Sequence, residues 1–468
     1  MRENNRFIKI VGFLTLLISF SSKETLAKSA KKQSPNLNQK IEELEQKQKI
    51  LERKLEVEKE QQEAKEKEAS KDRANVGINT KDGFYIQSAN GDYKLKIRGY
   101  IHSDGRFFLE DKGDKFANQF VLRRVRPVFE GTLSKYFDFR IMPDFGEGKV
   151  VLQDAYGNIK IDKAFQIRFG KFKEPVGLER LQSGTNLFSV ERGLPTALVP
   201  NRDLGVQIHG EFWDGTLQYA AGFFNGVLDG GSTDSDNSDG KDGAARIFVH
   251  PFRKTENDAL KNLGLGVAVT YGSQKGASLA SPQLASYKSV GQNTFFSYRN
   301  DGTAAGTVLA NGKRWRLTPQ AYYYVGPFGI WGEYVRSTQE VALGAAQPDL
   351  THSAWQLAAS YVITGEENSF QGIKVKKPIN PSKGQWGAVE VGGRYNELRI
   401  DKDAFPLFAD PNKSASRARS WGLAANWYLS QNFKWTLSYD QTLYKGGAAA
   451  GANRANEHAL FTRLQVSY

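Results

Sequence analysis

The chain has 468 residues, contains no cysteine and carries a formal charge of +13 at neutral pH. The lack of cysteine excludes a disulfide framework and a thiolate metal site, and the five histidines are scattered at positions 102, 209, 250, 352 and 458. We therefore predict neither a metal site nor another cofactor. The positive charge fits nucleic acid, anionic lipid or an anion-attracting pore, and these classes differ in where the cations lie.

The first 27 residues have the pattern of a secretory signal peptide. Basic residues precede the apolar run at positions 10–20, and Thr25-Leu26-Ala27 forms a plausible cleavage site. A run this short cannot cross a bilayer as a helix, which needs about 20 apolar residues. We therefore predict an exported protein without a transmembrane helix.

After a predicted linker over residues 28–36, the sequence changes to heptads. One core position is held by leucine three times and the other by Ile, Gln and Leu, at residues 37, 44, 51 and 41, 48, 55. This 4-3 spacing predicts a periplasmic coiled-coil helix over 37–73, and a solvated single helix is the alternative. Three heptads are marginal alone, so we expect an oligomer to supply the partners. Residues 74–91 are predicted to be a hinge.

From residue 92 to the C-terminus the hydrophobic period is two, which predicts β-strands. About sixteen alternating segments occur, most of them near the 9–11 residues that a tilted membrane strand requires. They cover residues 93–102, 120–133, 136–145, 151–161, 165–170, 204–212, 216–224, 245–250, 263–271, 314–324, 328–336, 352–362, 386–396, 419–429, 433–442 and 458–468.

Alternation alone also fits a soluble antiparallel sandwich, but three features favour a membrane barrel. Tryptophan and tyrosine gather near strand ends on the apolar face, as in the girdles of outer-membrane barrels. Connections alternate between short and long, and the last strand ends on an aromatic residue, Tyr468. Lipid accepts a sheet only when it is closed. We therefore predict an all-β fold, an antiparallel transmembrane β-barrel over residues 92–468 in the outer membrane of a Gram-negative bacterium.

One connection, residues 173–203, is far longer than the usual 4–6 residues and is not polar filler. It contains three prolines, apolar residues and the pairs Glu179-Arg180 and Glu191-Arg192. A surface loop with two local ion pairs is the alternative interpretation. We predict a loop folded into the barrel that presents Arg180 and Arg192 to the lumen.

If the apolar face contacts lipid, the opposite face places many cations in the lumen. The basic track consists of Lys94, Lys96, Arg98, Arg126, Arg140, Arg168, Arg314 and Arg316. A low-dielectric wall focuses their field and attracts anions, although several of them are expected to pair with inward acids. The aromatic residues lie on the opposite face, which argues against nucleic acid, and no Ser/His/Asp arrangement predicts an enzyme.

Several stretches resemble the phosphate-selective porin O and P family: KLKIRGYIHSDGRFF, FVLRRVRPVFEG, FDFRIMPDF, LQDAYGNI, FQIRFGKFKEPVGLERLQS and SVERG. The likeness is strongest between residues 93 and 224. It implies a homotrimer of sixteen-stranded outer-membrane barrels whose third loop folds inward and carries a basic anion site.

The resemblance also assigns site residues. The family's paired arginines match Arg123 and Arg124, its inward aspartate matches Asp154, and its loop lysine and second arginine match Arg180 and Arg192. Its Ser-Ser corresponds to Ser183-Gly184, so one hydroxyl is missing. Strand parity places Arg123 on the apolar side, so it must turn inward where the strand meets the loop. The arginine ladder that the phosphate-specific members carry in a later external loop is reduced here to Lys275, Lys288 and Arg299.

Two functions follow from these patterns. The first is an outer-membrane porin for passive diffusion of anions, phosphate or polyphosphate among them, through a basic constriction formed by Arg123, Arg124, Asp154, Arg180, Ser183 and Arg192. The second is a structural barrel that anchors the periplasmic coiled coil to peptidoglycan, with non-specific conduction. Outer-membrane lipid is a predicted partner in both.

Overall fold

The computed structural model describes residues 34–71, 74–79, 83–109, 117–235 and 239–468. They fall into two compact units that divide after residue 73. The predicted signal peptide and residues 28–33 of the predicted linker lie outside the described residues.

The first unit contains helix α2, which spans Ser34–Lys71 and so begins inside the predicted linker. Its heptad leucines are exposed: Leu37 by 65%, Leu44 by 65% and Leu51 by 60%. Within the described chain this apolar seam is uncovered, so a coiled coil with other copies stays a prediction. Among the described residues, every helix is too short or too polar to cross a bilayer.

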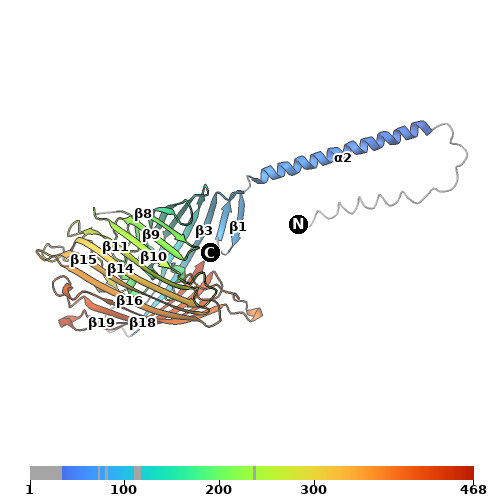
Figure 1. Ribbon diagram of the computed structural model, residues 1–468. Helices are drawn as coiled ribbons and strands as arrows, with labels where there is room; N and C mark the ends of the chain where they lie inside the picture. Colours follow the sequence, from blue (N-terminus) through green and yellow to red (C-terminus); the bar gives the residue numbers. More distant parts are fainter. Residues whose placement is uncertain (1–33, 72–73, 80–82, 110–116, 236–238) are drawn as a thin grey trace. The chain divides into compact units, whose positions relative to one another are not determined.

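The second unit is built on a closed antiparallel barrel of sixteen strands, β3–β11 and β14–β20 (Figure 1). Each strand pairs with its neighbour in chain order, and β20 closes the ring on β3, with Leu464 opposite Ser103. The predicted barrel is confirmed. The strands are β3 (Lys94–Leu109), β4 (Gln119–Leu133), β5 (Phe137–Asp144), β6 (Val151–Lys160), β7 (Gln166–Lys173), β8 (Arg202–Phe212), β9 (Leu217–Phe224), β10 (Asp242–Val249), β11 (Leu263–Lys275), β14 (Leu309–Val325), β15 (Phe328–Ala342), β16 (Asp349–Val362), β17 (Ala388–Arg399), β18 (Ala415–Tyr428), β19 (Phe433–Gly446) and β20 (Glu457–Ser467).

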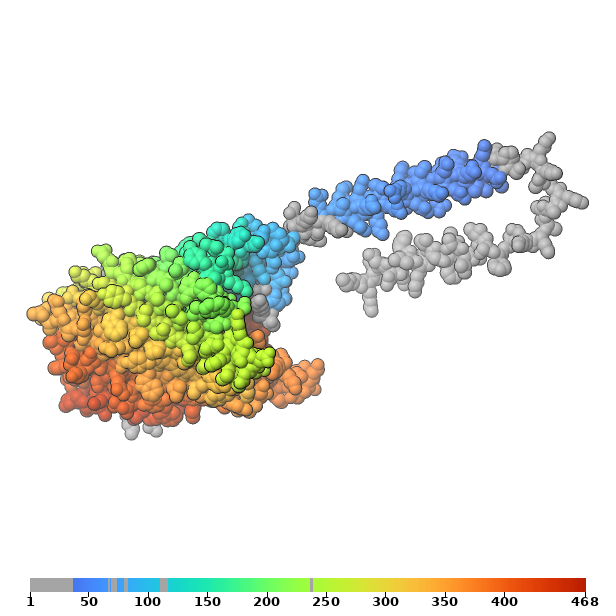
Figure 2. Space-filling model, in the orientation of Figure 1, coloured from blue at the N-terminus to red at the C-terminus, as the bar shows by residue number. Residues whose placement is uncertain are grey.

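The period of two decides which side chains face lipid. Along β18, Trp421 and Leu423 are exposed, whereas Ser420 and Ala424, which flank them, are buried. The same alternation recurs around the ring, and part of the outer face is in view in Figure 2. Since every backbone group of a closed sheet has a partner, this apolar outer face is compatible with hydrocarbon.

Residues 74–91 are not the simple hinge that we predict from the sequence. They contain a hairpin of β1 (Asn75–Asn79) and β2 (Gly83–Gln87). β2 pairs with the start of β3, with Phe84 opposite Ile97. The reason is local: both five-residue segments alternate, and the edge of β3 below the end of β20 is free to accept a strand.

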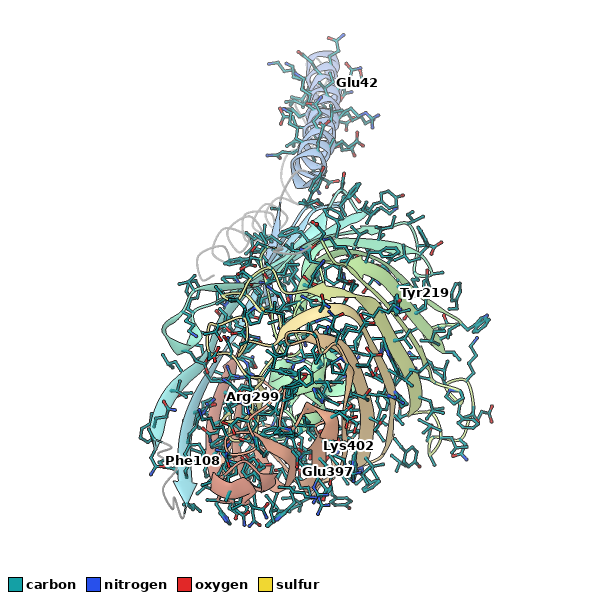
Figure 3. All side chains as sticks on the ribbon, turned by 90° about the vertical axis from the view of Figure 1, so that its left-hand side faces the viewer. Glu42, Phe108, Tyr219, Arg299, Glu397 and Lys402 are labelled. Carbon is teal, nitrogen blue, oxygen red and sulfur yellow. The ribbon has the colours of Figure 1, made fainter. Side chains whose placement is uncertain are left out.

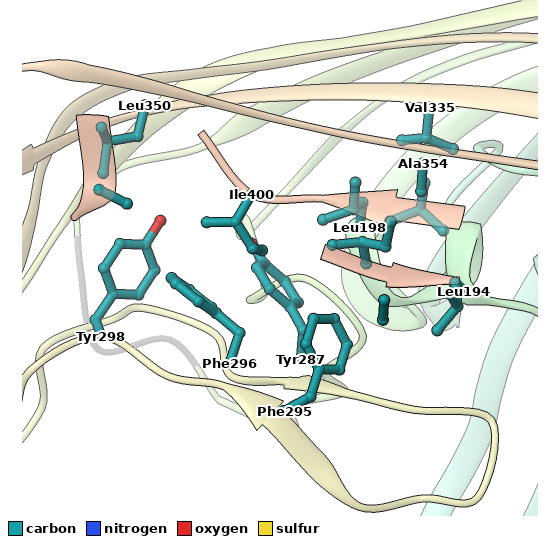
Figure 4. Close-up of a cluster of buried hydrophobic side chains, with 14 of the residues drawn as sticks. Leu194, Leu198, Tyr287, Phe295, Phe296, Tyr298, Val335, Leu350, Ala354 and Ile400 are labelled. Atoms are coloured by element: carbon teal, nitrogen blue, oxygen red, sulfur yellow. The ribbon is translucent and has the colours of Figure 1, made fainter. Parts of the chain in front are cut away.

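The connection between β11 and β14 also differs from the expected external loop. It contains a small sheet, β12 (Tyr287–Lys288) with β13 (Thr294–Phe296). Phe296 and Tyr298 pack with Leu198, Leu350 and other inner-wall residues in a buried cluster (Figure 4). Burying such side chains stabilises the loop by about 1.5–3 kcal/mol each, so apolar packing holds this loop inside the barrel.

The connection between β7 and β8, residues 174–201, is the constriction loop, and it contains the short helix α3 (Leu178–Leu181). Its backbone bonds to residues of β15–β20 on the far wall, for example from Asn426 Nδ2 to Phe188 O at 2.9 Å. From the other end of the barrel, loop 363–387 reaches it, where Gln182 Nε2 donates to Phe370 O at 2.9 Å. Figure 3 shows how side chains fill the space enclosed by the strands.

Candidate functional site

A buried acid on the far wall holds the start of the constriction loop. Glu333 on β15 accepts backbone N–H bonds from Leu178 at 2.7 Å and from Glu179 at 3.2 Å. Gln356 on β16 then bridges Glu333 and the Glu179 carboxylate at 2.8 and 3.1 Å. The N-terminal N–H groups of a helix need acceptors, and this network supplies them. It fixes the position at which the loop crosses the lumen.

A later part of the constriction loop is fixed by Glu191, which is 4% exposed. Its carboxylate lies 2.8 Å from Arg123 Nε, 3.1 Å from Arg106 Nη2, 3.6 Å from Arg463 Nη2 and 4.0 Å from Arg124 Nη2. Burial opposes ionisation, but these guanidinium groups hold the pKa of the Glu191 carboxyl well below its usual value. One loop carboxylate therefore binds the barrel wall through four arginines.

A β-bulge explains how Arg123 reaches this carboxylate. His102 on β3 pairs with Arg124, but Ser103 pairs with Leu122, which leaves Arg123 as the extra residue. A bulge re-aims a side chain that strict alternation would send to the other face. The side chains of Arg123 and Arg124 consequently both lie on the lumen side of the strand. Arg124 Nη1 lies 3.1 Å from His102 Nδ1.

Beside these arginines lies a cavity of about 170 Å³, here called the basic cavity. The constriction loop forms one side, and β4, β6 and the β5–β6 connection form the other. Acids contribute only two of its charged side chains, Asp144 and Glu147. Its cations are Arg123, Arg124, Arg126, Lys149, Lys173, Arg180, Arg192 and Arg202.

Three of these cations are bound only by backbone carbonyls among the described residues. Arg180 donates to Thr196 O, Arg192 to Glu179 O at 3.0 Å and Gln182 O at 2.8 Å, and Lys173 to Gln182 O at 2.9 Å. Burial lowers the pKa of Arg180 to about 9 and that of Arg192 to about 10, so both are cations at neutral pH. A carbonyl bond orients a charge without neutralising it, and the cavity keeps a net positive field.

Asp154 on β6 does not itself line the basic cavity, but it pairs with Arg202, which does. It accepts from Arg202 Nε at 2.7 Å and from Arg140 Nε at 3.1 Å. Arg140 also pairs with Glu130 at 2.7 Å. Asp154 thus holds two arginines in fixed orientation.

Ser183 does not lie in the basic cavity. It is exposed, pairs with Thr185 Oγ1 at 2.8 Å and lines a separate cavity of about 460 Å³ beside the C-terminal Tyr468. Its neighbour Gly184 lines the basic cavity instead. The neighbours in Glu179-Arg180 and Glu191-Arg192 bind different partners rather than each other, so the local ion pairs of the alternative interpretation are not formed.

The residues of the predicted basic track lie in different surroundings. Arg314 and Arg316 are buried against Asp242 at 2.6 and 3.2 Å, and Arg316 also binds Asp229, so they knit the wall together. Arg126 pairs with Asp144 at 2.7 Å, and Arg98 pairs with Glu130. Lys94 lies 4.8 Å from the centre of the Tyr85 ring. Lys96 lies on β3 opposite Glu130. Arg168 faces a different cavity.

Sequence reasoning missed three cations of the cavity, Lys149, Lys173 and Arg202. Lys173 and Arg202 are the paired residues at which β7 ends and β8 begins. Their positions on either side of the long connection were the signal in the sequence that could have identified them. The residues described contain no group of three or more His, Asp or Glu side chains arranged to hold a metal ion.

Most of the chain matches a known protein family. Residues 95–468 match the family described as phosphate-selective porin O and P. No curated protein matches the chain.

Solved structures with a similar barrel include the outer-membrane channel DcaP of Acinetobacter baumannii, with 10% identity, a TM-score of 0.53, and coverage of 80% of this chain and 97% of that one. An anion-selective porin from Comamonas acidovorans has 10% identity and a TM-score of 0.50, covering 80% and 100%. In-vitro folded OmpT of Vibrio cholerae has 11% identity and a TM-score of 0.50, covering 81% and 98%. These likenesses bear on the fold. The chain belongs to the phosphate-selective porin O and P family and is an outer-membrane porin channel.

Proposed function

We propose that this porin conducts anions in preference to cations, with inorganic phosphate among its solutes, and that the basic cavity sets this preference. The observation that carries the proposal is that Lys173, Arg180 and Arg192 donate to backbone carbonyls and form no salt bridge with a carboxylate of the described chain. Charged groups at a narrow point of a pore select the sign of the ion that passes. A planar guanidinium also binds phosphate oxygens in bidentate fashion.

The proposed path follows the β4–β8 side of the lumen, where the residues that line the basic cavity lie. An anion enters beside Lys149 and Arg123 and exchanges hydration water for the N–H donors of Arg124, Arg180 and Arg192. It leaves past Arg140 and Lys434, which line the larger cavity beside Tyr468.

Chloride conductance with and without added phosphate tests this proposal. We expect single-channel chloride current in planar bilayers to fall in the presence of low millimolar phosphate, because phosphate occupies the basic cavity longer than chloride does. An equal concentration of a cation such as tetramethylammonium, added as chloride salt, is the control. Phosphate that leaves the chloride current unchanged would count against a phosphate site.

Replacing Gly184 by serine should strengthen phosphate binding. A Cβ at this position would lie 3.4 Å from the Tyr100 hydroxyl and 3.8 Å from Arg124 Nε, which is ordinary contact, so the side chain fits. Its hydroxyl would add one hydrogen-bonding group beside Arg124. One such bond contributes about 0.5–1.5 kcal/mol, so half-block by phosphate should need about two- to tenfold less phosphate. Gly184→Ala controls for the added volume, and serine and alanine variants with equal block would contradict the assignment.

The homotrimer and the periplasmic coiled coil are part of the same proposal. The apolar seam of α2 is exposed in the single chain, and neighbouring copies in an oligomer would hold three such helices at high effective concentration. This seam also favours the second candidate function, a barrel that anchors the coiled coil to peptidoglycan.

Deletion of residues 28–73 separates the two functions. The barrel keeps its strands and its constriction loop, so conductance and phosphate block should be unchanged. If the coiled coil anchors the envelope, cells with the deletion should become more sensitive to detergent. A double variant, Leu44→Asp with Leu51→Asp, is the matched control, since it disrupts the seam without shortening the chain. Loss of channel activity in the deletion variant would contradict the separation.

A further inference from the structure

A second basic chamber lies on the other side of the constriction loop. It has a volume of about 280 Å³ and is lined by inner-wall residues of β7, β8 and β10 and by the loop residues Pro175 and Leu181. It lies toward the short turns that join β6 to β7 and β8 to β9. Lys173 lines both this chamber and the basic cavity, so the two are neighbours in series.

The chamber contains arginines that other side chains do not neutralise. The Arg168 guanidinium lies 4.6 Å from the centre of the Tyr156 ring, and its buried Nε has no hydrogen-bond partner among the described residues. Arg246 lies over Phe248 and, within the described part of the chain, donates only to the Gln320 amide, at 3.0 and 3.3 Å. Stacking on an aromatic face fixes the plane of a guanidinium and leaves its N–H edge free for an oxyanion. One acid, Glu211, also lines the chamber.

One neutral group in the chamber also lacks a partner. Gln207 is 5% exposed, and its Oε1 accepts no hydrogen bond from the described residues. A buried amide oxygen without a donor costs free energy, and a ligand hydroxyl would satisfy it. His209, held at 2.7 Å from Asn158 Oδ1, lies on the same strand. Pro175 and Leu181 supply an apolar side that a bare inorganic ion cannot use.

We propose that this chamber binds small organic anions that carry hydroxyl groups, either phosphate esters or carboxylates, and passes them to or from the basic cavity through Lys173. Arg168 and Arg246 hold the anionic group, Gln207 accepts from a hydroxyl, and the loop prolyl and leucyl side chains cover the carbon skeleton. The volume is close to the lower end of small-molecule pockets, about 300–1,000 Å³, and exceeds what a lone phosphate fills. The inference rests on the proposed anion preference, because an anion must reach the chamber through the pore.

Block of chloride current by matched solutes tests the proposal in the full-length channel. The solutes are inorganic phosphate, glucose 6-phosphate, gluconate and uncharged glucose, added in turn to each side of the bilayer. We expect half-block by glucose 6-phosphate or gluconate at concentrations at least about tenfold lower than by inorganic phosphate, while glucose has no effect. Block by only one of the two organic anions would assign the chamber to phosphate esters or to carboxylates.

Variants locate the binding to the chamber. R168Q with R246Q should raise the half-block concentration of the organic anion about tenfold or more, as expected for the loss of charge-assisted bonds. R168K keeps the charge but loses the planar fork, so it should show the same effect in smaller measure. R253Q, on an exposed turn, should behave as wild type. Heat-modifiable migration on SDS gels verifies that each variant is folded.

Two results would overturn the proposal that the chamber binds organic anions. The first is equal block by glucose 6-phosphate, gluconate and inorganic phosphate in wild type, and the second is unchanged block in the variant that carries both R168Q and R246Q. Neither result affects the anion preference, which the reversal potential reports separately. Conversely, a channel without anion preference that is still blocked by the organic anion would refute the proposed function and leave the chamber intact.

Discussion

Replacing Arg180 and Arg192 together by glutamate is expected to abolish the anion preference of the pore. Both side chains line the basic cavity and have no carboxylate partner in the described chain. Two reversals change the local charge by four units. Unit charges about 4 Å apart interact by about 1–4 kcal/mol between water and a partly buried site, and 1.4 kcal/mol corresponds to a tenfold change. The chloride-to-potassium permeability ratio should therefore fall at least about tenfold.

A series of variants separates charge from loop structure in this experiment. Arg180→Gln with Arg192→Gln removes the charges but keeps donors for the carbonyls of the loop, so its permeability ratio should lie between wild type and the glutamate variant. Arg253→Glu, on an exposed turn, introduces the same reversal away from the cavity. A glutamate variant that matches wild type in reversal potential would show that the ion path avoids the basic cavity.

Glu191→Gln is expected to destabilise the barrel by about 3–5 kcal/mol, the usual effect of removing one partner from a buried ion pair. Glu191 is the shared carboxylate of Arg106, Arg123 and Arg463. Without its charge, these guanidinium groups repel one another in a buried setting. Urea unfolding followed by tryptophan fluorescence measures the loss. Glu147→Gln is the control, because its pair with Arg123 is partly exposed and contributes at most about 1 kcal/mol.

The Glu191 carboxylate should also make the stability of the protein depend on pH. Its pKa in the folded protein lies below the ordinary value of about 4.3, so folding favours the ionised form. The resulting stabilisation is fully present above pH 4.3 and is lost as the pH falls through the folded pKa. Wild type and Glu191→Gln should therefore differ in stability at pH 7 and converge in strong acid. A constant difference from pH 7 to pH 2 would contradict this role for Glu191.

The strands could be predicted from the sequence because each obeys one simple rule. In a closed barrel lipid lies outside and polar or packed groups lie inside, so alternation appears in every strand, from Tyr93 to Tyr468. The length and composition of residues 173–203, beside strands of this kind, indicated an inward loop, as the family resemblance did, and the tethers of Leu178 and Asn426 place it there. The alternation rule fails where a bulge occurs. Parity alone sends Arg123 toward lipid, whereas the extra residue opposite His102 turns it inward.

Other features depend on contacts between distant residues, which a local pattern does not contain. Phe295-Phe296 indicates an apolar segment, but only Leu350 and Ile400 on the opposite wall explain why that loop enters the lumen. Likewise, Glu191 is adjacent to Arg192 in sequence yet binds Arg123 and Arg463, which are 68 and 272 positions away. Sequence adjacency therefore suggested local ion pairs where the structure forms long-range ones.

The reversal potential of the wild-type channel in a potassium chloride gradient tests the central claim most directly. The cations of the basic cavity predict a zero-current potential close to the chloride equilibrium potential, with the preference weakening as salt screens the field. A potential near zero, or one displaced toward the potassium equilibrium potential, would contradict the assignment of Lys173, Arg180 and Arg192 as the groups that select the permeating ion.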